Sequence, residues 1–382
     1  MATLQRDLAQ LMQAQGEQGP YVSIFMAVSP YESGVDGDKG RFRGLIQQAK
    51  VNFKTRYSEK NWATYQAEFE TVLQTRALGN NGAKSVAIIA GSEQILVYPL
   101  NITVANVVHV GDNLYLLPVI ENDQFNLDYD LLKLNRTEMA FWQVQDGLAK
   151  KVDLPNEAPK TSEQALGTEL TSGKMRWTSS GGNGGVHGQD LKTRTQENDH
   201  QKYFQIVDNF IYKNYSRPQQ RRLVLMATTE NQSILRKVSK NEYLLKDTTL
   251  TKLPAKLDQG VINQLVLSIN QKLSQDVMTI LATQVDQARS AKKYLDDLSD
   301  IISRTTEGGV ATLFVAKDAT VPGIMDLKQN LDLKSPAAKA NNLLNDLSVA
   351  TLALGGQVYV LPADELPANT PAIAVLRGVN QI

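Results

Sequence analysis

The sequence contains no cysteine in its 382 residues, which excludes disulfide bonds and thiolate chemistry. Only three histidines occur, His109, His187 and His200, so we expect no histidine-built metal site. No apolar run approaches the ~18 residues that a membrane helix requires, and the first residues, MATLQRDLAQ, lack the apolar core of a signal peptide. These absences favour a cytoplasmic protein with no membrane partner, no metal and no cofactor.

A charge excess of one sign is also missing. Forty basic and forty acidic residues give a formal net charge of zero, so no global field attracts this chain to nucleic acid. Any contact with RNA must therefore come from local basic patches. The length exceeds that of one ordinary hydrophobic core, and we expect an α/β (α+β) protein of three domains.

Residues 1–126 are predicted to form an N-terminal α/β domain. A buried strand at 22–28 precedes two helices whose apolar residues recur at helical spacing. Asn61 stands directly before the second helix and is expected to cap it. Short apolar runs then predict four strands, at 85–90, 94–98, 101–109 and 113–120.

Residues 127–270 are predicted to form the middle domain. Three apolar runs separated by turn residues indicate an antiparallel meander, at 129–134, 139–144 and 148–154. A helix beyond residue 200 and an apolar strand at 222–227 follow. Antiparallel strands followed by alternating helix and strand are typical of a mixed sheet.

Residues 271–382 are predicted to form a C-terminal three-layer α/β domain, which a long helix from Asp258 joins to the middle one. Its first clear strand covers 310–315. A single helix is expected to follow, with Ser335 as its cap, Pro336 at its first position and Gly355 beyond its end.

The least typical stretch is the Gly-rich loop 181–189. Five of the eight residues from Gly181 to Gly188 are glycine, which has no Cβ and lets a backbone approach another molecule closely. A mobile tip held between cations suits an anionic partner such as RNA, whereas a plain solvent-exposed linker is the alternative. We predict two groups of RNA-binding residues: Lys174, Arg176, Lys192 and Arg194 beside the loop, and Arg217, Arg221 and Arg222 near one strand.

Several stretches resemble one known family in the expected order. They are Asp128–Asp153 with Pro159–Gly167, Gly181–Asp190 with His200–Asp208, and Glu307–Val315. They resemble the bacterial relatives of the archaeo-eukaryotic class-1 peptide chain release factors and of Pelota. The resemblance implies an RNase H-like middle domain and a last domain similar to kink-turn-binding ribosomal proteins. It also implies the ribosome, with its tRNA and rRNA, as the partner, and we expect a protein partner for the C-terminal domain.

True release factors of this family carry a Gly-Gly-Gln loop that helps water attack the peptidyl-tRNA ester. The nearest match here is His187-Gly188-Gln189, in which histidine replaces the first glycine. In a hydrolytic reaction Gln189 would position water with its amide, and Gly188 would let the backbone approach the ester. The bulk of His187 opposes such an approach and favours a non-hydrolytic role. The Asn-Ile-Lys-Ser motif of stop-codon decoding is absent from the first domain.

We therefore expect a translation-associated, release-factor-like protein that acts on stalled or idle ribosomes without decoding stop codons. The alternative is a peptidyl-tRNA ester hydrolase that uses the His-Gly-Gln loop, so the question of an enzyme stays open. Two other enzyme classes are disfavoured. A self-contained esterase would need a nucleophile elbow, which Ser179 and Ser180 lack. A stand-alone RNase H-like nuclease would need clustered carboxylates.

Overall fold

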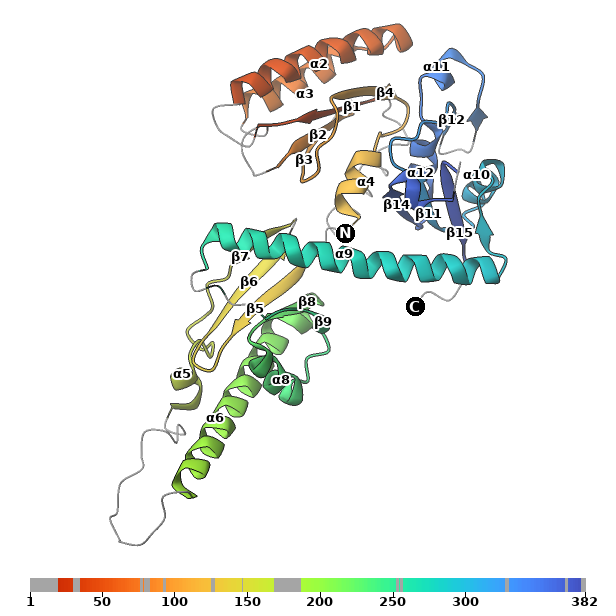
Figure 1. The fold of residues 1–382 in the computed structure, drawn as a ribbon. Helices are drawn as coiled ribbons and strands as arrows, with labels where there is room; N and C mark the ends of the chain where they lie inside the picture. The colour runs from red at the N-terminus through yellow and green to blue at the C-terminus, as the bar shows by residue number, and fades with distance from the viewer. Residues whose placement is uncertain are drawn as a thin grey trace, which may run out of the picture. The chain divides into compact units, whose positions relative to one another are not determined.

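The chain divides into two compact units in the computed structural model (Figure 1). Unit 1 consists of Met1–Phe125 and Val277–Ile382, and unit 2 of Asn126–Asp276. The structure describes residues 20–29, 35–75, 78, 83–91, 94–124, 128–145, 147–167, 187–251, 254, 257–326, 330–367 and 370–378. None of the helices within these ranges combines the length and the hydrophobicity that crossing a bilayer requires.

Unit 2 is built on a five-stranded mixed sheet with the order β7-β6-β5-β8-β9. Its strands are β5 (Tyr129–Leu134), β6 (Met139–Gln145), β7 (Leu148–Lys151), β8 (Arg222–Met226) and β9 (Leu244–Leu250). The first three form the predicted antiparallel meander, whereas β8 runs parallel to β5 and β9 parallel to β8. The mixed sheet expected of an RNase H-like middle domain is therefore confirmed.

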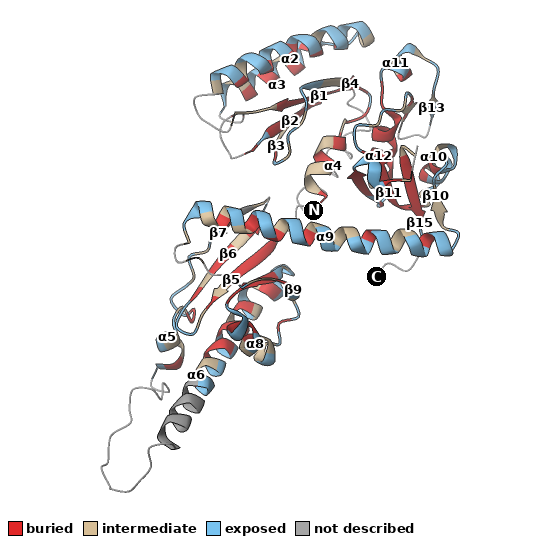
Figure 2. Ribbon diagram, in the orientation of Figure 1, coloured by how far each residue is buried: buried red, intermediate tan, exposed pale blue. Residues whose placement is uncertain are grey.

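Helices cover both faces of this sheet (Figure 2). Because successive strand residues point to opposite faces, Leu132 packs with one layer of helices and Leu131 with the other. The first layer contains α5 (Ser162–Leu166), α6 (His187–Ile211) and α8 (Thr229–Val238). The second is the first half of α9 (Gln259–Ser290), whose apolar residues contact Tyr129 and Trp142. β5 is thus buried on both faces, and even its acidic residue, Asp130, is buried.

The first sheet of unit 1 has the order β3-β2-β1-β4 and is antiparallel throughout. Its strands are β1 (Tyr21–Ala27), β2 (Ser85–Ala90), β3 (Ile95–Leu100) and β4 (Val107–Gly111). Two helices, α2 (Val35–Arg56) and α3 (Trp62–Gln74), cover one face through an aromatic cluster that includes Phe53 and Phe69. Asn61 caps α3 as predicted, since its Oδ1 accepts a hydrogen bond from the Ala63 N–H at 3.0 Å.

The expected strand at 113–120 is wrong. The chain forms the helix α4 (Leu117–Asp123) there instead, with Pro118 in its first turn. Proline has no N–H to donate and a fixed φ, so it suits the first turn of a helix and not the interior of a sheet. The apolar residues of this segment resembled a strand because they are buried on more than one side.

The second sheet of unit 1 has the order β10-β15-β11-β14. Its strands are β10 (Tyr294–Leu295), β11 (Val310–Ala316), β14 (Gln357–Leu361) and β15 (Ala372–Leu376). One face packs against α10 (Leu298–Thr306) and α12 (Leu343–Ala353), and the other against the second half of α9. A small hairpin, β12 (Ile324–Met325) and β13 (Leu331–Asp332), lies beside α12.

The single helix expected from Ser335 to Gly355 is also wrong, because the chain forms α11 (Pro336–Lys339) and α12 there. Ser335 does cap the first of them. The helical path breaks at Asn341 and Asn342. Asn341 donates to the Gly323 carbonyl at 2.7 Å, and Asn342 caps α12.

The first and last predicted domains fall in the same unit and share one hydrophobic core. The side chain of Asn345 in α12 accepts a hydrogen bond from the Leu116 N–H through Oδ1 and donates one to the Leu114 carbonyl through Nδ2, both at 2.8 Å. Gln124 makes the same double contact with the backbone of Val360, at 2.6 and 2.7 Å. The division of unit 1 into separate domains stays a prediction.

Candidate functional site

The Gly-rich loop lies almost entirely outside the described residues, which stop at Gly167 and resume at His187. Lys174, Arg176 and residues 181–186 of the loop fall in the gap, so the mobility predicted for 181–186 lies outside the described residues. The helix α6 begins at His187, so the backbone of Gly188 and Gln189 belongs to its first turn. The side chains of 187–196, with those of Lys192 and Arg194, lie outside the described residues as well.

The described residues on both sides of this gap belong to packed elements. α5 and α6 meet in one apolar core, to which Leu166 and Tyr203 both contribute. The Tyr203 hydroxyl donates to the Pro159 carbonyl at 3.3 Å and ties α6 to the segment before α5. Thr161 caps α5 by accepting a hydrogen bond from the Gln164 N–H at 3.1 Å. The helices on both sides of the Gly-rich stretch therefore pack into the same hydrophobic core.

Charged side chains lie beside α6 near His200. Arg136 of the β5–β6 turn forms an ion pair with Glu230 at the start of α8. Beside them, burial lowers the pKa of His200, and the charge of Arg136 lowers it further. His200 therefore favours the neutral form here, and its buried Nδ1 atom has no hydrogen-bond partner in the described part of the chain.

Arg221, which the sequence predicts as an RNA contact, forms hydrogen bonds and ion pairs within the domain. Its Nε donates to Asp130 at 3.0 Å, and its Nη2 donates to the carbonyls of Tyr129 and Val144 at 3.1 and 2.6 Å. Asp128 lies 3.5 Å from the same guanidinium. The side chain of Arg221 is only 14% exposed, and that of Asp130 is 0% exposed. The structure gives Arg221 an internal role, as the partner of a buried carboxylate, and leaves it few donors for RNA.

The same ion pair bears on the nuclease alternative. Burial raises the pKa of Asp130 to about 6, although Arg221 opposes the rise. A metal-dependent nuclease needs several carboxylates that face one cation, whereas here Asp130 and Asp128 both pair with the guanidinium of Arg221. Within the ranges that the structure describes, no group of three or more histidine or acidic side chains is arranged to hold a metal ion.

Arg217 and Arg222 remain accessible. Arg217 is exposed at the start of α7 (Arg217–Gln219), and Arg222 is exposed at the start of β8, opposite Tyr129 in the sheet register. Neither pairs with a carboxylate among the described side chains. A hydrogen bond between Gln143 and Gln219, at 3.0 Å, ties α7 to β6 at this end of the sheet. The structure thus leaves two of the three predicted cations free to contact phosphate.

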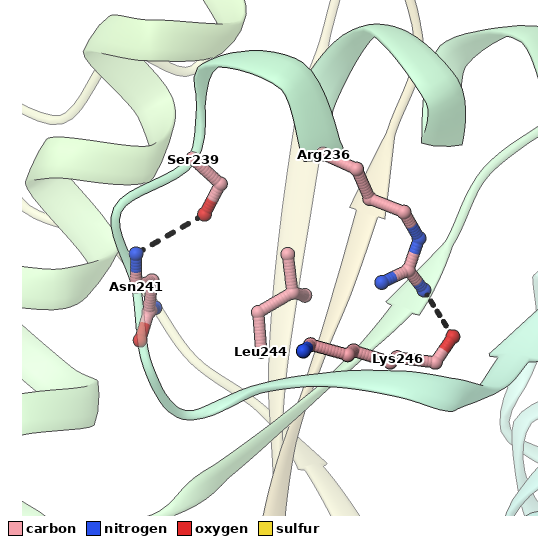
Figure 3. A pocket seen from close by; sticks show the side chains of 5 residues that line it. All are labelled: Arg236, Ser239, Asn241, Leu244 and Lys246. Carbon is pink, nitrogen blue, oxygen red and sulfur yellow. Dashed lines mark hydrogen bonds between the residues drawn. The ribbon is translucent and has the colours of Figure 1, made fainter.

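Sequence reasoning missed two further cations, Arg236 and Lys246. Both line an open pocket between α8 and β9 (Figure 3). The signal was present in the sequence, because residues 236–246 contain four cationic side chains and one acidic one.

Residues 127–272, which are almost the whole of unit 2, match the sequence profile of Bacterial archaeo-eukaryotic release factor family 6. This match confirms the resemblance that the sequence motifs indicate. Residues 127–272 form a release-factor-like domain. No curated protein matches the chain in sequence.

Solved structures similar to the chain include the following three. One is archaeal Pelota, in a structure of ribosome-bound Pelota and ABCE1, with 10% identity over 75% of this chain and 73% of that one and a TM-score of 0.40. Dom34 of S. cerevisiae, a translation termination-like factor, has 12% identity, coverages of 74% and 73%, and a TM-score of 0.36. The archaeal translation termination factor aRF1 has 12% identity over 98% of each chain and a TM-score of 0.23.

Proposed function

We propose that this protein binds ribosomes and acts on stalled or idle ones without decoding stop codons. The observation that carries the proposal is the match of residues 127–272 to a release factor family. The described structure supports it in one respect. The Gly-rich stretch joins α5 and α6, which share one core, so the release-factor-like domain presents the stretch from a packed base.

The contacts with RNA are local, since the net charge of the chain is zero. In this proposal Arg217 and Arg222 contact phosphate from one end of the sheet, and Lys192 and Arg194 do so from α6. Arg221 is left out because its donors are used within the domain. Each phosphate contact releases counterions, and binding by such patches is therefore sensitive to salt.

The hydrolytic alternative assigns Gln189 the task of positioning water at the peptidyl-tRNA ester. Two observations bear on it. Histidine stands where release factors have their first glycine, and a side chain at His187 adds bulk where the backbone must approach the ester. In addition, α6 begins at His187, so Gly188 and Gln189 have helical backbone. We therefore favour the non-hydrolytic role.

Single-turnover release of a labelled peptide from ribosomal complexes separates the two functions. The proteins to compare are the wild type, Gln189→Ala and His187→Gly. Gln205→Ala is the matched control, since it removes the same amide from an exposed position of the same helix. We expect no release above background from any of them, and retained ribosome binding in all. Robust release by the wild type that Gln189→Ala reduces about a hundredfold or more, while Gln205→Ala preserves it, would establish hydrolysis.

A further inference from the structure

A pocket of about 330 Å³ opens on unit 2 between the end of α8, the turn that follows it, and β9 (Figure 3). It is lined by Arg236, Ser239, Asn241, Leu244 and Lys246. The surrounding segment, residues 236–246, has three more cationic than acidic side chains in a chain whose net charge is zero. Such a local excess attracts anions.

Arg236 is held in place for binding. Its Nη2 donates to the carbonyls of Leu245 and Lys246, at 3.0 and 2.7 Å, which anchors one edge of the guanidinium on β9. Figure 3 shows the other terminal nitrogen directed into the pocket. A guanidinium offers donors in a planar fork that matches the oxygens of a phosphate. Because the anchor already restricts this side chain, binding costs little further rotamer entropy.

Lys246 supplies a second positive charge. Its side chain is exposed, and among the described residues no carboxylate forms an ion pair with it. In Figure 3 its ammonium group lies on the pocket side, near Leu244 and below Arg236. Two cationic side chains therefore line one open pocket, and together they attract an anion more strongly than an isolated surface charge does.

The polar wall of the pocket is built by hydrogen bonds within the domain. Ser239 donates to a buried carboxylate oxygen of Asp208 at 2.6 Å and accepts the Asn241 N–H at 3.2 Å. Asn241 in turn donates to the buried Ser216 hydroxyl at 3.0 Å. The second oxygen of Asp208 accepts the Lys240 N–H at 3.0 Å, so hydrogen bonds to the turn satisfy both oxygens of its carboxylate. These bonds fix the turn against α6, and the shape of the pocket exists before any ligand binds.

We propose that this pocket binds a phosphate group, with Arg236 and Lys246 as its ligands. Phosphate oxygens accept several charge-assisted hydrogen bonds at once, as an anchored arginine beside a lysine provides. The pocket is open, so the phosphate can belong to a chain. We identify the source as the RNA backbone; this identification rests on the proposed function, whereas the phosphate site itself does not.

The test has two arms and uses the full-length protein. In the first, inorganic phosphate is titrated at constant ionic strength while NMR follows the backbone amides of Arg236 and Lys246. In the second, fluorescence anisotropy follows the binding of a labelled single-stranded RNA oligonucleotide across a series of salt concentrations. Lys246→Gln is the principal variant because its exposed side chain contributes little to folding. Lys237→Gln is the matched control, an exposed cation on α8 that does not line the pocket.

We expect saturable shifts with phosphate that Lys246→Gln weakens about fivefold, the effect of roughly one net hydrogen bond. RNA affinity should fall to a similar extent, and the slope of log affinity against log salt should decrease by about 0.7. Lys237→Gln should change neither result by more than about twofold, as an exposed charge away from the contact does.

Dependence on Lys246 in the phosphate arm alone would support the pocket and identify a free phosphate compound as its source. Absence of saturable shifts, or an equal loss in Lys237→Gln and Lys246→Gln, would overturn the proposal. Failure of the proposed function is distinguishable, because it would remove ribosome binding while phosphate binding persists.

Discussion

Replacing Arg221 with methionine should destabilise unit 2 by an amount that depends on pH. The substitution keeps an unbranched apolar stem but removes the guanidinium that faces Asp130, whose side chain is fully buried. It also removes the hydrogen bonds to the carbonyls of Tyr129 and Val144. The expected loss therefore has a part due to charge and a part due to hydrogen bonding.

The charge part has an upper limit. Burial raises the pKa of Asp130 from 3.8 to about 6, so at pH 7.5 its ionised form already costs about 3 kcal/mol relative to the unfolded chain. Without Arg221 the pKa rises further, but the neutral acid is always available, at a cost of about 5 kcal/mol at this pH. Losing the partner charge therefore costs at most about 2 kcal/mol. The two lost hydrogen bonds add about 1 kcal/mol each, which gives about 2–4 kcal/mol in total.

The charge part should vanish in acid. A carboxyl whose pKa is raised by folding binds protons more readily in the folded state, so wild-type stability falls as pH rises from about 4 to about 6. At pH 5 Asp130 is mainly protonated in both proteins, and Arg221 no longer compensates a charge. The loss in Arg221→Met should then shrink to the hydrogen-bond part, about 2 kcal/mol.

Urea titrations at pH 5 and 7.5, with hydrogen exchange of β5 and β8 read by mass spectrometry, measure this loss in unit 2 separately. Arg222→Met is the matched control: it removes an exposed arginine from the next position and should cost under about 0.5 kcal/mol at either pH. In a background of Asp130→Asn, the effect of Arg221→Met should not vary with pH. An equal loss at both pH values in the single variant would refute the reasoning.

Two further predictions concern unit 1. Asn345→Ala leaves the buried Leu114 carbonyl and Leu116 N–H without partners and should lower the free energy of unfolding of unit 1 by about 2–4 kcal/mol. Hydrogen exchange should then show lost protection in unit 1 but not in β5, and a loss below about 1 kcal/mol would contradict the prediction. Burial and the charge of Arg56 lower the pKa of His109 to about 4, so unit 1 should lose stability as pH falls from about 6.5 towards 4. His109→Gln should be less sensitive to acid than the wild type in urea titrations over this range, and identical pH profiles would show that His109 is not the cause.

Local rules predicted much of the fold. Apolar runs separated by turn residues identified the β5–β7 meander, and side-chain caps at Asn61 and Ser335 formed as their positions indicate. These features depend on neighbours in the sequence, so a sequence contains the information needed to find them.

Features that depend on distant partners were not predictable in this way. Arg221 resembled an RNA contact because its partner Asp130 lies 91 residues away. The break between α11 and α12 depends on Asn341, which bonds to Gly323 instead of continuing a helix whose apolar pattern looks unbroken. The shared core of unit 1 rests on contacts such as that between Asn345 and Leu116, 229 residues apart.

The candidate site was predictable in outline only. The release-factor-like character of the middle domain could be recognised from motifs in order, and the match of residues 127–272 confirms it for that domain. The cations of the pocket, Arg236 and Lys246, stand ten positions apart, and nothing local indicates that their side chains face one space. Only the pairing of α8 with the turn and β9 brings them together.

Sedimentation of the protein with purified ribosomes tests the central claim most directly. The wild type and an Arg217→Gln/Arg222→Gln variant should be compared with empty, stalled and actively translating ribosomes over a series of salt concentrations. We predict preferential binding to stalled or empty ribosomes that weakens steeply with salt, and a salt slope that is smaller by about 1–2 in the variant. Failure to sediment with any ribosomal state at low salt would contradict the proposed function. Binding that is independent of salt would contradict the phosphate contacts on which it depends.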